Sequence, residues 1–308
     1  MLKQAAKSAI RKLKLLQVVQ SVARPRILIL RYHSVRKDPA LLDDCISVGI
    51  THSLAVFRSQ MEYVAKRCNP ISLERLPDVT NGRIEVPRRG VIVTFDDGYI
   101  DNYAIAAPVL EEYGLRGVFY IPTSSVEGRS LWFIRLRHWQ IRGGKSRQEF
   151  LDVSSRCAVL SDSDREEFMA RLGNDSAVPD TFSMTWAQAR ELQSRGHIIG
   201  SHSVNHPNIA KVSSNEMKTE MECSKRTIEE RLDCQVEHFS YPNPILEPHW
   251  DRSTIQACRC AHYRTAVTST EGHVVQGTNT LALPRHSVPN SFDEFVWNLE
   301  MAFNGSKR

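Results

Sequence analysis

The central stretch of the chain reads Val91-Ile92-Val93-Thr94-Phe95-Asp96-Asp97-Gly98. Its first five residues are apolar or β-branched, which predicts a strand buried on both faces, as in a parallel sheet covered by helices. The polar Asp-Asp-Gly that follows predicts a turn at the end of this strand. Parallel strands bring their carboxyl ends to one edge of a sheet, so Asp96 and Asp97 are expected at the edge where sites form.

Further apolar runs alternate with helical patterns on both sides of this stretch. Residues 27–33 predict a buried strand, and the spacing of Leu54, Phe57, Met61 and Val64 predicts a helix between Ser53 and Arg67. Other strands are expected at 117–121, 197–200, 237–241, 265–268 and 281–283, and other helices at 101–113, 186–195, 215–232 and 253–260. About seven strands alternating with helices predict an α/β fold with a parallel sheet, and a barrel in preference to an open sheet.

Residues 124–182 have a different composition, rich in Arg, Ser and Asp, and predict a largely helical insertion. Aromatic residues gather in it at Trp132-Phe133 and His138-Trp139. Two interpretations are open: these rings stack on a sugar, or they form a small core inside the insertion.

The positive charge lies at the N-terminus. The 308 residues contain 40 Lys+Arg and 35 Asp+Glu, a net charge of +5. Residues 1–37 hold ten basic and no acidic residues, which leaves 30 basic and 35 acidic residues, a net charge of −5, from Asp38 onward. This distribution argues against a body that binds nucleic acid, which would need a basic face on the folded domain.

Residues 1–25 predict a basic amphipathic helix, because Lys3, Lys7, Arg11 and Lys14 fall on one helical face. Three interpretations are open. The helix packs on the domain, it contacts anionic lipid at a membrane surface, or it is a degenerate signal peptide that ends near Ser21-Val22-Ala23.

Cysteine usage and hydropathy suggest a cytoplasmic protein. The seven cysteines are irregularly spaced and form no Cys-x-x-Cys, which favours reduced thiols over a disulfide framework. The mean hydropathy is −0.35. No uncharged apolar run approaches the roughly 18 residues of a membrane span.

Polar residues follow several of the predicted strands: His33, Asp96-Asp97, His202 with His206, the turn from Tyr241 to Pro244, and Arg285-His286. One helical turn would point the imidazoles of His202 and His206 the same way. Two neutral imidazoles and one carboxylate leave open positions on a divalent metal, as a catalytic site requires. Each motif alone has an ordinary explanation, since Asp-Asp-Gly also caps helices and histidines are common near helix starts.

Together, these segments resemble a family. Thr94-Phe95-Asp96-Asp97-Gly98-Tyr99 and Ser201-His202-Ser203-Val204-Asn205-His206 resemble the first two motifs of the polysaccharide deacetylases that share the NodB homology domain, the fourth carbohydrate-esterase family. Residues 30–35, 239–244 and 263–267 resemble other segments of that family, and the resemblance covers roughly residues 26–290. It implies a deformed (β/α) barrel over residues 26–308, which follows the N-terminal helix and carries the insertion at about 124–182.

The resemblance also implies roles for individual residues. Asp96 would be the general base that takes a proton from metal-bound water, and Asp97, His202 and His206 would hold the divalent metal, usually Zn²⁺. The turn at Tyr241 and Asn243 would contact the substrate and its oxyanion. The products would be acetate and a free amino sugar.

Three motifs depart from the family pattern. The fourth, an Asp and Trp pair, has no clear counterpart, and Trp250-Asp251 resembles it only loosely. Ser240 takes the position of an Arg in the third motif, so Asp96 lacks one usual neighbour. In the fifth motif Arg285 takes the position of the acid His, and His286 follows one residue later. A shift of one residue turns a side chain to the opposite face of a strand, so His286 would need a bulge to act as the acid. His33 is the other candidate.

The expected function is therefore removal of N-acetyl groups from amino sugars of a polysaccharide or glycolipid precursor, with a place in exopolysaccharide biosynthesis. Two alternatives stay open: a metal-dependent amidohydrolase that acts on a small-molecule amide, and a non-catalytic carbohydrate-binding relative. The basic N-terminus suggests a peripheral position at the inner face of the membrane.

Overall fold

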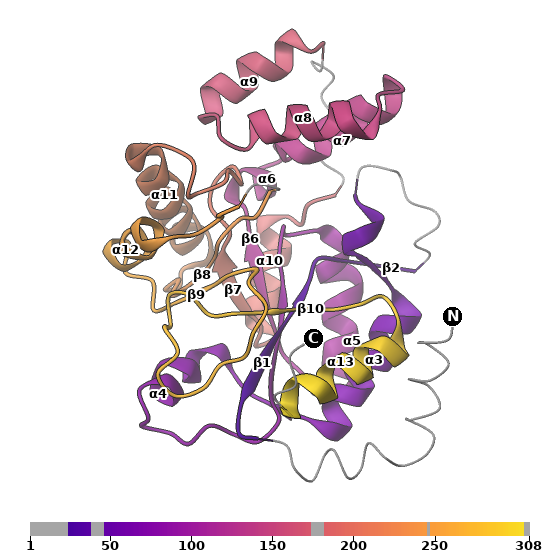
Figure 1. Ribbon diagram of the computed structural model, residues 1–308, viewed down its shortest axis with the longest axis vertical. Coiled ribbons are helices and arrows are strands. Elements are labelled where there is room, and N and C mark those ends of the chain that lie inside the picture. Colours follow the sequence, from indigo (N-terminus) through magenta and orange to yellow (C-terminus); the bar gives the residue numbers. More distant parts are fainter. Residues whose placement is uncertain (1–23, 38–45, 174–181, 245–246, 305–308) are drawn as a thin grey trace.

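The computed structural model describes residues 24–37, 46–173, 182–244 and 247–304. Its centre is an eight-stranded parallel sheet with the order β10-β1-β5-β6-β7-β8-β9, in which β4 pairs with β5 (Figure 1). The strands are β1 (Ile27–Tyr32), β4 (Asn69–Pro70), β5 (Gly90–Phe95), β6 (Gly117–Ile121), β7 (Ile198–Ser201), β8 (His238–Ser240), β9 (Thr265–Val267) and β10 (His286–Ser287). A separate parallel pair consists of β2 (Ser34–Arg36) and β3 (Thr51–Ser53).

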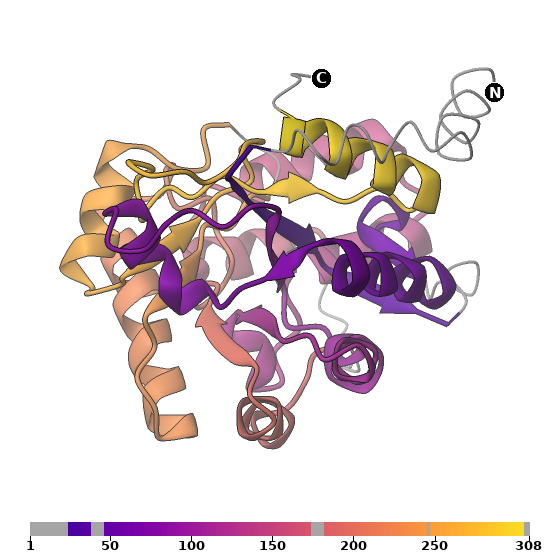
Figure 2. The same cartoon turned by 90° about the horizontal axis from the view of Figure 1, so that it is seen from below.

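Helices follow most strands and surround the sheet (Figure 2). They are α3 (Leu54–Arg67), α4 (Leu76–Thr80), α5 (Ala107–Glu112), α6 (Thr123–Val126), α7 (Trp132–Arg142), α8 (Arg147–Cys157), α9 (Asp162–Arg171), α10 (Trp186–Ser194), α11 (Ser214–Leu232), α12 (Arg252–Cys260) and α13 (Phe292–Asn304). Short helical turns lie at η2 (Val48–Ile50), η3 (Leu73–Arg75) and η4 (Asn102–Ala106). Within the described ranges, no helix combines the length and apolar character needed to cross a membrane. The predicted helix at 1–25 lies almost wholly outside the described residues.

The apolar runs of β1, β5 and β6 are buried, as the sequence predicts. Alternate residues of β1 enter two different cores. Ile27 and Ile29 belong to the smaller core, which also takes residues from β5, β6 and β9, whereas Leu28 and Leu30 pack in the larger core with residues of α3, α5, α11 and α13. This period of two, with both faces apolar, explains the continuous hydrophobic runs.

The sheet curls into a half-barrel whose two edges are joined by a short segment. At one edge, Leu283 forms a parallel bridge with Val267 of β9. At the other, His286 of β10 pairs with Leu30 of β1. The predicted barrel is therefore confirmed in a deformed form, but the strand expected at 281–283 is reduced to this bridge, and the ladder with β1 forms three residues later.

The insertion is helical, as predicted, and consists of α6 to α9. Figure 1 shows α7, α8 and α9 together at the end of the molecule beyond β6 and β7. They have a core of their own, made of Trp132, Leu136, Cys157, Ala158 and Met169, against which Trp139 also packs. Core packing thus accounts for the two tryptophans of the insertion.

Strand register brings the expected polar residues to one edge of the sheet. Tyr32 pairs with Phe95, and Ile121 pairs with Ser201. The residues that follow these strand ends, among them His33, Asp96 and His202, therefore lie side by side at the carboxyl edge.

Candidate active site

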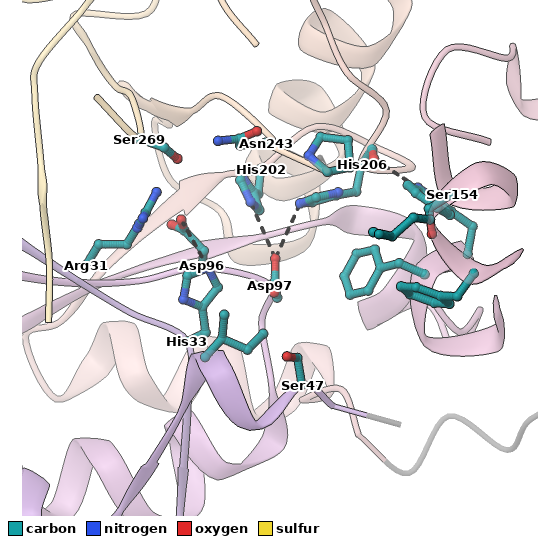
Figure 3. A pocket seen from close by; sticks show the side chains of 16 residues that line it. Arg31, His33, Ser47, Asp96, Asp97, Ser154, His202, His206, Asn243 and Ser269 are labelled. Carbon is teal, nitrogen blue, oxygen red and sulfur yellow. Dashed lines mark hydrogen bonds and ion pairs between the residues drawn. The ribbon is translucent and has the colours of Figure 1, made fainter. Parts of the chain in front are cut away.

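Asp97, His202 and His206 converge at the carboxyl edge of the sheet and are all buried. The Nε2 atom of His202 lies 3.5 Å from Oδ1 of Asp97, and the Nε2 atom of His206 lies 3.4 Å from the same oxygen (Figure 3). One potential ligand atom from each residue falls within 4.8 Å of the other two. This set of two imidazoles and one carboxylate is the donor chemistry of a catalytic Zn²⁺ or a similar divalent cation.

The hydrogen bonding of His202 supports a metal at this position. Its Nδ1 atom lies 2.7 Å from the carbonyl oxygen of Ser240, so Nδ1 carries the proton and donates it. In the neutral ring, Nε2 then presents a lone pair to the Asp97 carboxylate, and two acceptors face each other without a hydrogen between them. A cation between the imidazole nitrogen and the carboxylate oxygen would satisfy both acceptors. The hydrogen bond to the Ser240 carbonyl would hold the His202 ring in place, as hydrogen bonds to the second nitrogen of metal-binding histidines generally do. The residues therefore fit a divalent metal.

The two histidines lie on an irregular loop, so the predicted helical turn between them is wrong. Ser203 and His206 adopt positive φ angles of 67° and 57°. The buried carboxylate of Glu220 on α11 accepts the backbone N–H groups of Val204 at 2.7 Å and Asn205 at 2.8 Å. Loop conformation, rather than helical spacing, thus directs both rings toward Asp97.

Asp97 lies two residues after the end of β5 and adopts a left-handed conformation with a φ angle of 72°, and Gly98 follows with 65°. Asp tolerates this region better than most side chains do, and Gly enters it without a Cβ penalty. The sharp turn sends the two carboxylates in different directions, so that Asp97 faces the Nε2 atoms of His202 and His206 while Asp96 is bonded by Arg285 and Ser240.

Asp96 is held by a buried arginine from the other end of the sequence. Arg285 donates Nη1 to Oδ1 at 2.8 Å and Nη2 to Oδ2 at 2.7 Å, and Ser240 donates its hydroxyl to Oδ1 at 3.2 Å. The side chains of Arg285 and Asp96 are 0% and 3% exposed. The arginine missing from the third motif is therefore replaced in space by Arg285, and Ser240 leaves room for it.

These contacts set the charge of the site. Burial alone would raise the pKa of Asp96, but the charge of Arg285, the proximity of His202 and the hydrogen bonds from Arg285 hold it below its usual range. Burial likewise acts to raise the pKa of Asp97, and the facing imidazoles of His202 and His206 hold it well below. Both carboxylates are therefore ionised at neutral pH.

Two residues expected in the site lie elsewhere. His286 does not line the cavity over Asp96: its Nδ1 lies 3.2 Å from Glu271, and it lines a separate small cavity with Phe295 and Leu299. β10 pairs with β1 in regular register, so the bulge that His286 would need is absent from this ladder, and Arg285 points to Asp96 instead.

The side chain of Tyr241 is also outside the cavity. Its ring packs in the larger core, its hydroxyl donates to the carbonyl of Leu281 at 2.9 Å, and its backbone N–H donates to Val267. The hydroxyl and the backbone N–H of Tyr241 are therefore both engaged within the fold, and the contribution of this turn falls to Asn243.

Asn243 and His33 do line the cavity, which has a volume of about 400 Å³ and holds Asp96, Asp97, His202 and His206 in its wall. The Nε2 atom of His33 lies 4.0 Å from Oδ2 of Asp96. Burial lowers the pKa of His33 to about 4, so its ring is neutral near pH 7.

Three further residues support the site in roles that the sequence did not predict. They are Arg285, Glu220 and Trp132, whose Nε1 donates to the carbonyl of His206 at 3.0 Å. For Arg285 a signal existed, because a chain that keeps the buried Asp96 and lacks the usual arginine needs another cation nearby. Glu220 and Trp132 carry no such signal, since they act on backbone groups.

Comparison with known proteins agrees with this geometry. The family model described as Polysaccharide deacetylase matches residues 83–266. The Bacillus subtilis (strain 168) protein YxkH, whose name describes a polysaccharide deacetylase, is 23% identical over 195 residues, which are 63% of this chain and 50% of that protein. The chain thus matches only half the length of this relative.

Solved structures share the fold. The Streptococcus pyogenes deacetylase PplD has a TM-score of 0.62 at 19% identity, with 89% of this chain and 98% of that chain covered. IcaB from Ammonifex degensii has 0.61 at 18% identity, with 91% and 99% covered. A de-N-acetylase from Aggregatibacter actinomycetemcomitans has 0.64 at 17% identity, with 89% and 99% covered.

The matched segment contains Asp96, Asp97, His202 and His206 and spans more than half of the sequence. The chain belongs to the polysaccharide deacetylase family.

Proposed function

We propose that this protein is a metal-dependent hydrolase that removes N-acetyl groups from amino sugars of a polysaccharide or glycolipid precursor. The observation that carries the proposal is the pair of adjacent carboxylates with separate environments. Asp97 faces two imidazoles at 3.4 and 3.5 Å, and Asp96 is held beside them by Arg285. A protein that only binds glycans has no need of a second buried carboxylate beside a metal site.

Asp97, His202 and His206 would hold the metal, with Zn²⁺ as the expected ion. A bound divalent cation would polarise the amide carbonyl and acidify water. The remaining steps belong to side chains of the cavity.

Asp96 accepts the proton of the attacking water. Arg285 fixes the carboxylate through two parallel hydrogen bonds, and Ser240 supplies a third, so the proton-accepting group cannot rotate out of line. The backbone N–H of Asn243 donates to the oxyanion that forms as the carbonyl is attacked.

The departing amine must receive a proton. With His286 outside the cavity, we assign this step to Asp96, which returns the proton it has taken from water, while the neighbouring His33 orients the site. The products are acetate and the protonated amino sugar. One proton of the attacking water reaches the amine nitrogen through Asp96 and the other is released as the acid ionises and is taken up by the amine, so the atoms of one water molecule and one amide balance.

The proposal is tested by acetate release from a substrate panel. Purified protein is offered N-acetylglucosamine oligomers, lipid-linked N-acetyl sugars and small N-acyl amides, and metal content is measured on the same sample. Acetate from the sugars supports the proposal. Turnover confined to small amides would favour the amidohydrolase alternative, and glycan binding without any turnover would favour a non-catalytic relative.

We also propose that residues 1–25 contact anionic membranes and place the enzyme at the inner face of the membrane, where glycan precursors are assembled. The proposal is based on the charge pattern, ten basic and no acidic residues in the first 37.

A further inference from the structure

The two histidines of the metal site are held in different ways. His202 directly follows β7, and its Nδ1 donates to the carbonyl oxygen of Ser240 at 2.7 Å, so the sheet fixes this ring. His206 lies nearer the insertion, with its ring centroid 4.9 Å from that of Phe133 on α7 and on the side of the site where Ser154 of α8 lies (Figure 3). Its Nδ1 has no hydrogen-bond partner in the part of the chain that the structure describes. The position of His206 therefore depends on the loop that carries it.

The insertion bonds this loop at His206 and again two residues later. Trp132 of α7 donates its Nε1 to the backbone carbonyl of His206 at 3.0 Å. The backbone N–H of Asn208 donates to the carbonyl of Ala158, the residue that follows α8, at 2.8 Å. Both bonds join the metal-ligand loop to helices that lie more than 30 residues away in the sequence.

Asn205, the residue before His206, is held from two sides. Its Oδ1 accepts a hydrogen bond from Nη1 of Arg129 in the insertion at 3.2 Å, and its Nδ2 donates to Oε1 of Glu220 on α11 at 3.0 Å. An amide offers its oxygen to a cation and its nitrogen to a carboxylate, so only one orientation of the side chain satisfies both neighbours. Asn205 is thereby fixed between the insertion and α11.

Arg129 is itself fixed by the acidic residues of α9. It bonds both carboxylate oxygens of Asp162, at 2.8 and 3.0 Å, and its Nη2 lies 2.8 Å from Glu166. Arg135 of α7 donates to the same Glu166 at 2.7 Å. Paired hydrogen bonds between a guanidinium and a carboxylate are strong and directional. A displacement of α9 would therefore move Arg129 away from Asn205.

We propose that the insertion acts as a clamp on the metal-ligand loop, so that its packing on the loop and the binding of a divalent cation by Asp97, His202 and His206 are energetically coupled. Arg129 and Trp132 are the positioning residues of this clamp. The coupling is reciprocal: the clamp raises the metal affinity, and a bound metal stabilises the insertion by the same free energy. The inference rests on the proposed function, because it concerns the metal that this function requires.

The first test measures the Zn²⁺ affinity of the metal-loaded, full-length protein by competition with a chelator of known affinity. Trp132→Phe keeps an aromatic ring and loses the N–H donor, and Arg129→Met loses the bond to Asn205. Each should weaken Zn²⁺ binding about tenfold, as loss of the outer partners of metal ligands does. Arg129→Lys keeps the positive charge and should restore part of the affinity.

The matched control is Arg135→Met. It removes the other arginine bonded to Glu166 and leaves the bond between Arg129 and Asn205 in place. It should weaken Zn²⁺ binding much less than Arg129→Met, although both variants remove a guanidinium from the same acidic cluster.

The second test is amide hydrogen exchange with and without Zn²⁺. In the wild type, Zn²⁺ should slow exchange in α7, α8 and α9, because a ligand that binds the closed form stabilises it. The slowing should be smaller in Arg129→Met, and α4, which packs in the smaller core, should not respond. A side chain that only stabilised the fold would change exchange equally with and without the metal.

Equal Zn²⁺ affinity in Arg129→Met and Arg135→Met, together with wild-type affinity in Trp132→Phe, would overturn the clamp. Exchange in α7 to α9 that does not respond to Zn²⁺ in the wild type would also overturn it. Both results leave the proposed deacetylation in place. A wild type that binds no divalent metal would instead overturn the metal site of the proposed function, and the clamp with it.

Discussion

Replacing Arg285 with Met removes the only guanidinium that the structure shows bonded to Asp96 within the described residues, and leaves a buried carboxylate. The two side chains are 0% and 3% exposed and are joined by bonds of 2.8 and 2.7 Å. Two unit charges about 4 Å apart attract by about 4 kcal/mol at an effective dielectric constant of about 20. Loss of one partner of a buried pair costs about 3–5 kcal/mol. We therefore expect Arg285→Met to lower the free energy of unfolding by about 3–5 kcal/mol.

The double variant separates this pair from ordinary packing effects. Asp96→Asn together with Arg285→Met removes both charges of the pair, so its loss should be smaller than the sum of the two single losses, with a coupling energy of about 3 kcal/mol. The exposed pair Arg83–Asp78, at 3.1 Å with 74% and 37% exposure, is the matched control and should couple by less than about 1 kcal/mol.

The assay is equilibrium unfolding in denaturant at pH 7, followed by circular dichroism, with a chelator present so that metal binding does not contribute. If Arg285→Met does not fold, Arg285→Gln, which also removes the charge but keeps a polar side chain, replaces it in the cycle. A coupling energy within about 0.5 kcal/mol of zero would refute the idea that Arg285 substitutes for the arginine missing near Ser240.

Three further predictions concern other parts of the chain. Glu220→Gln places an amide opposite the backbone N–H groups of the histidine loop and should weaken metal affinity about 10- to 100-fold by titration, whereas Glu222→Gln, at a side chain 41% exposed, should not. Burial raises the pKa of Asp101 to about 6, so between pH 4 and 6 the native state holds a proton that the unfolded state has lost. The free energy of unfolding should therefore fall by up to about 3 kcal/mol as the pH rises through this range. Asp101→Asn should flatten this pH dependence in denaturant unfolding curves. Deletion of residues 2–22 should abolish sedimentation with anionic liposomes and spare turnover of soluble oligomers, and unchanged liposome binding would show that the basic segment does not bind lipid.

The sequence predicted the central strands of the sheet because they are buried on both faces and are mostly apolar. β1, β5 and β6 are continuous hydrophobic runs, and a polar residue ends each site-bearing strand. Such local patterns need no knowledge of distant contacts. The same logic brought His33, Asp96 and His202 to one edge.

The sequence could not predict features that depend on distant pairing or on loop conformation. Arg285 and Asp96 are 189 residues apart, and their contact depends on the closure of the sheet by β10. The bend that directs His206 needs positive φ at Ser203 and His206, positions where no glycine marks it. The helix α13 also has no counterpart among the predicted elements.

The most direct measurement determines metal content and acetate release on the same preparations of the wild type, Asp96→Asn and His206→Ala. We expect about one divalent metal per chain in the wild type and in Asp96→Asn, with acetate release in Asp96→Asn reduced by about 10²- to 10⁴-fold. His206→Ala should lose both metal and activity. Acetate release by Asp96→Asn at the wild-type rate, or turnover by a wild type that holds no metal, would contradict the division of labour between the two carboxylates.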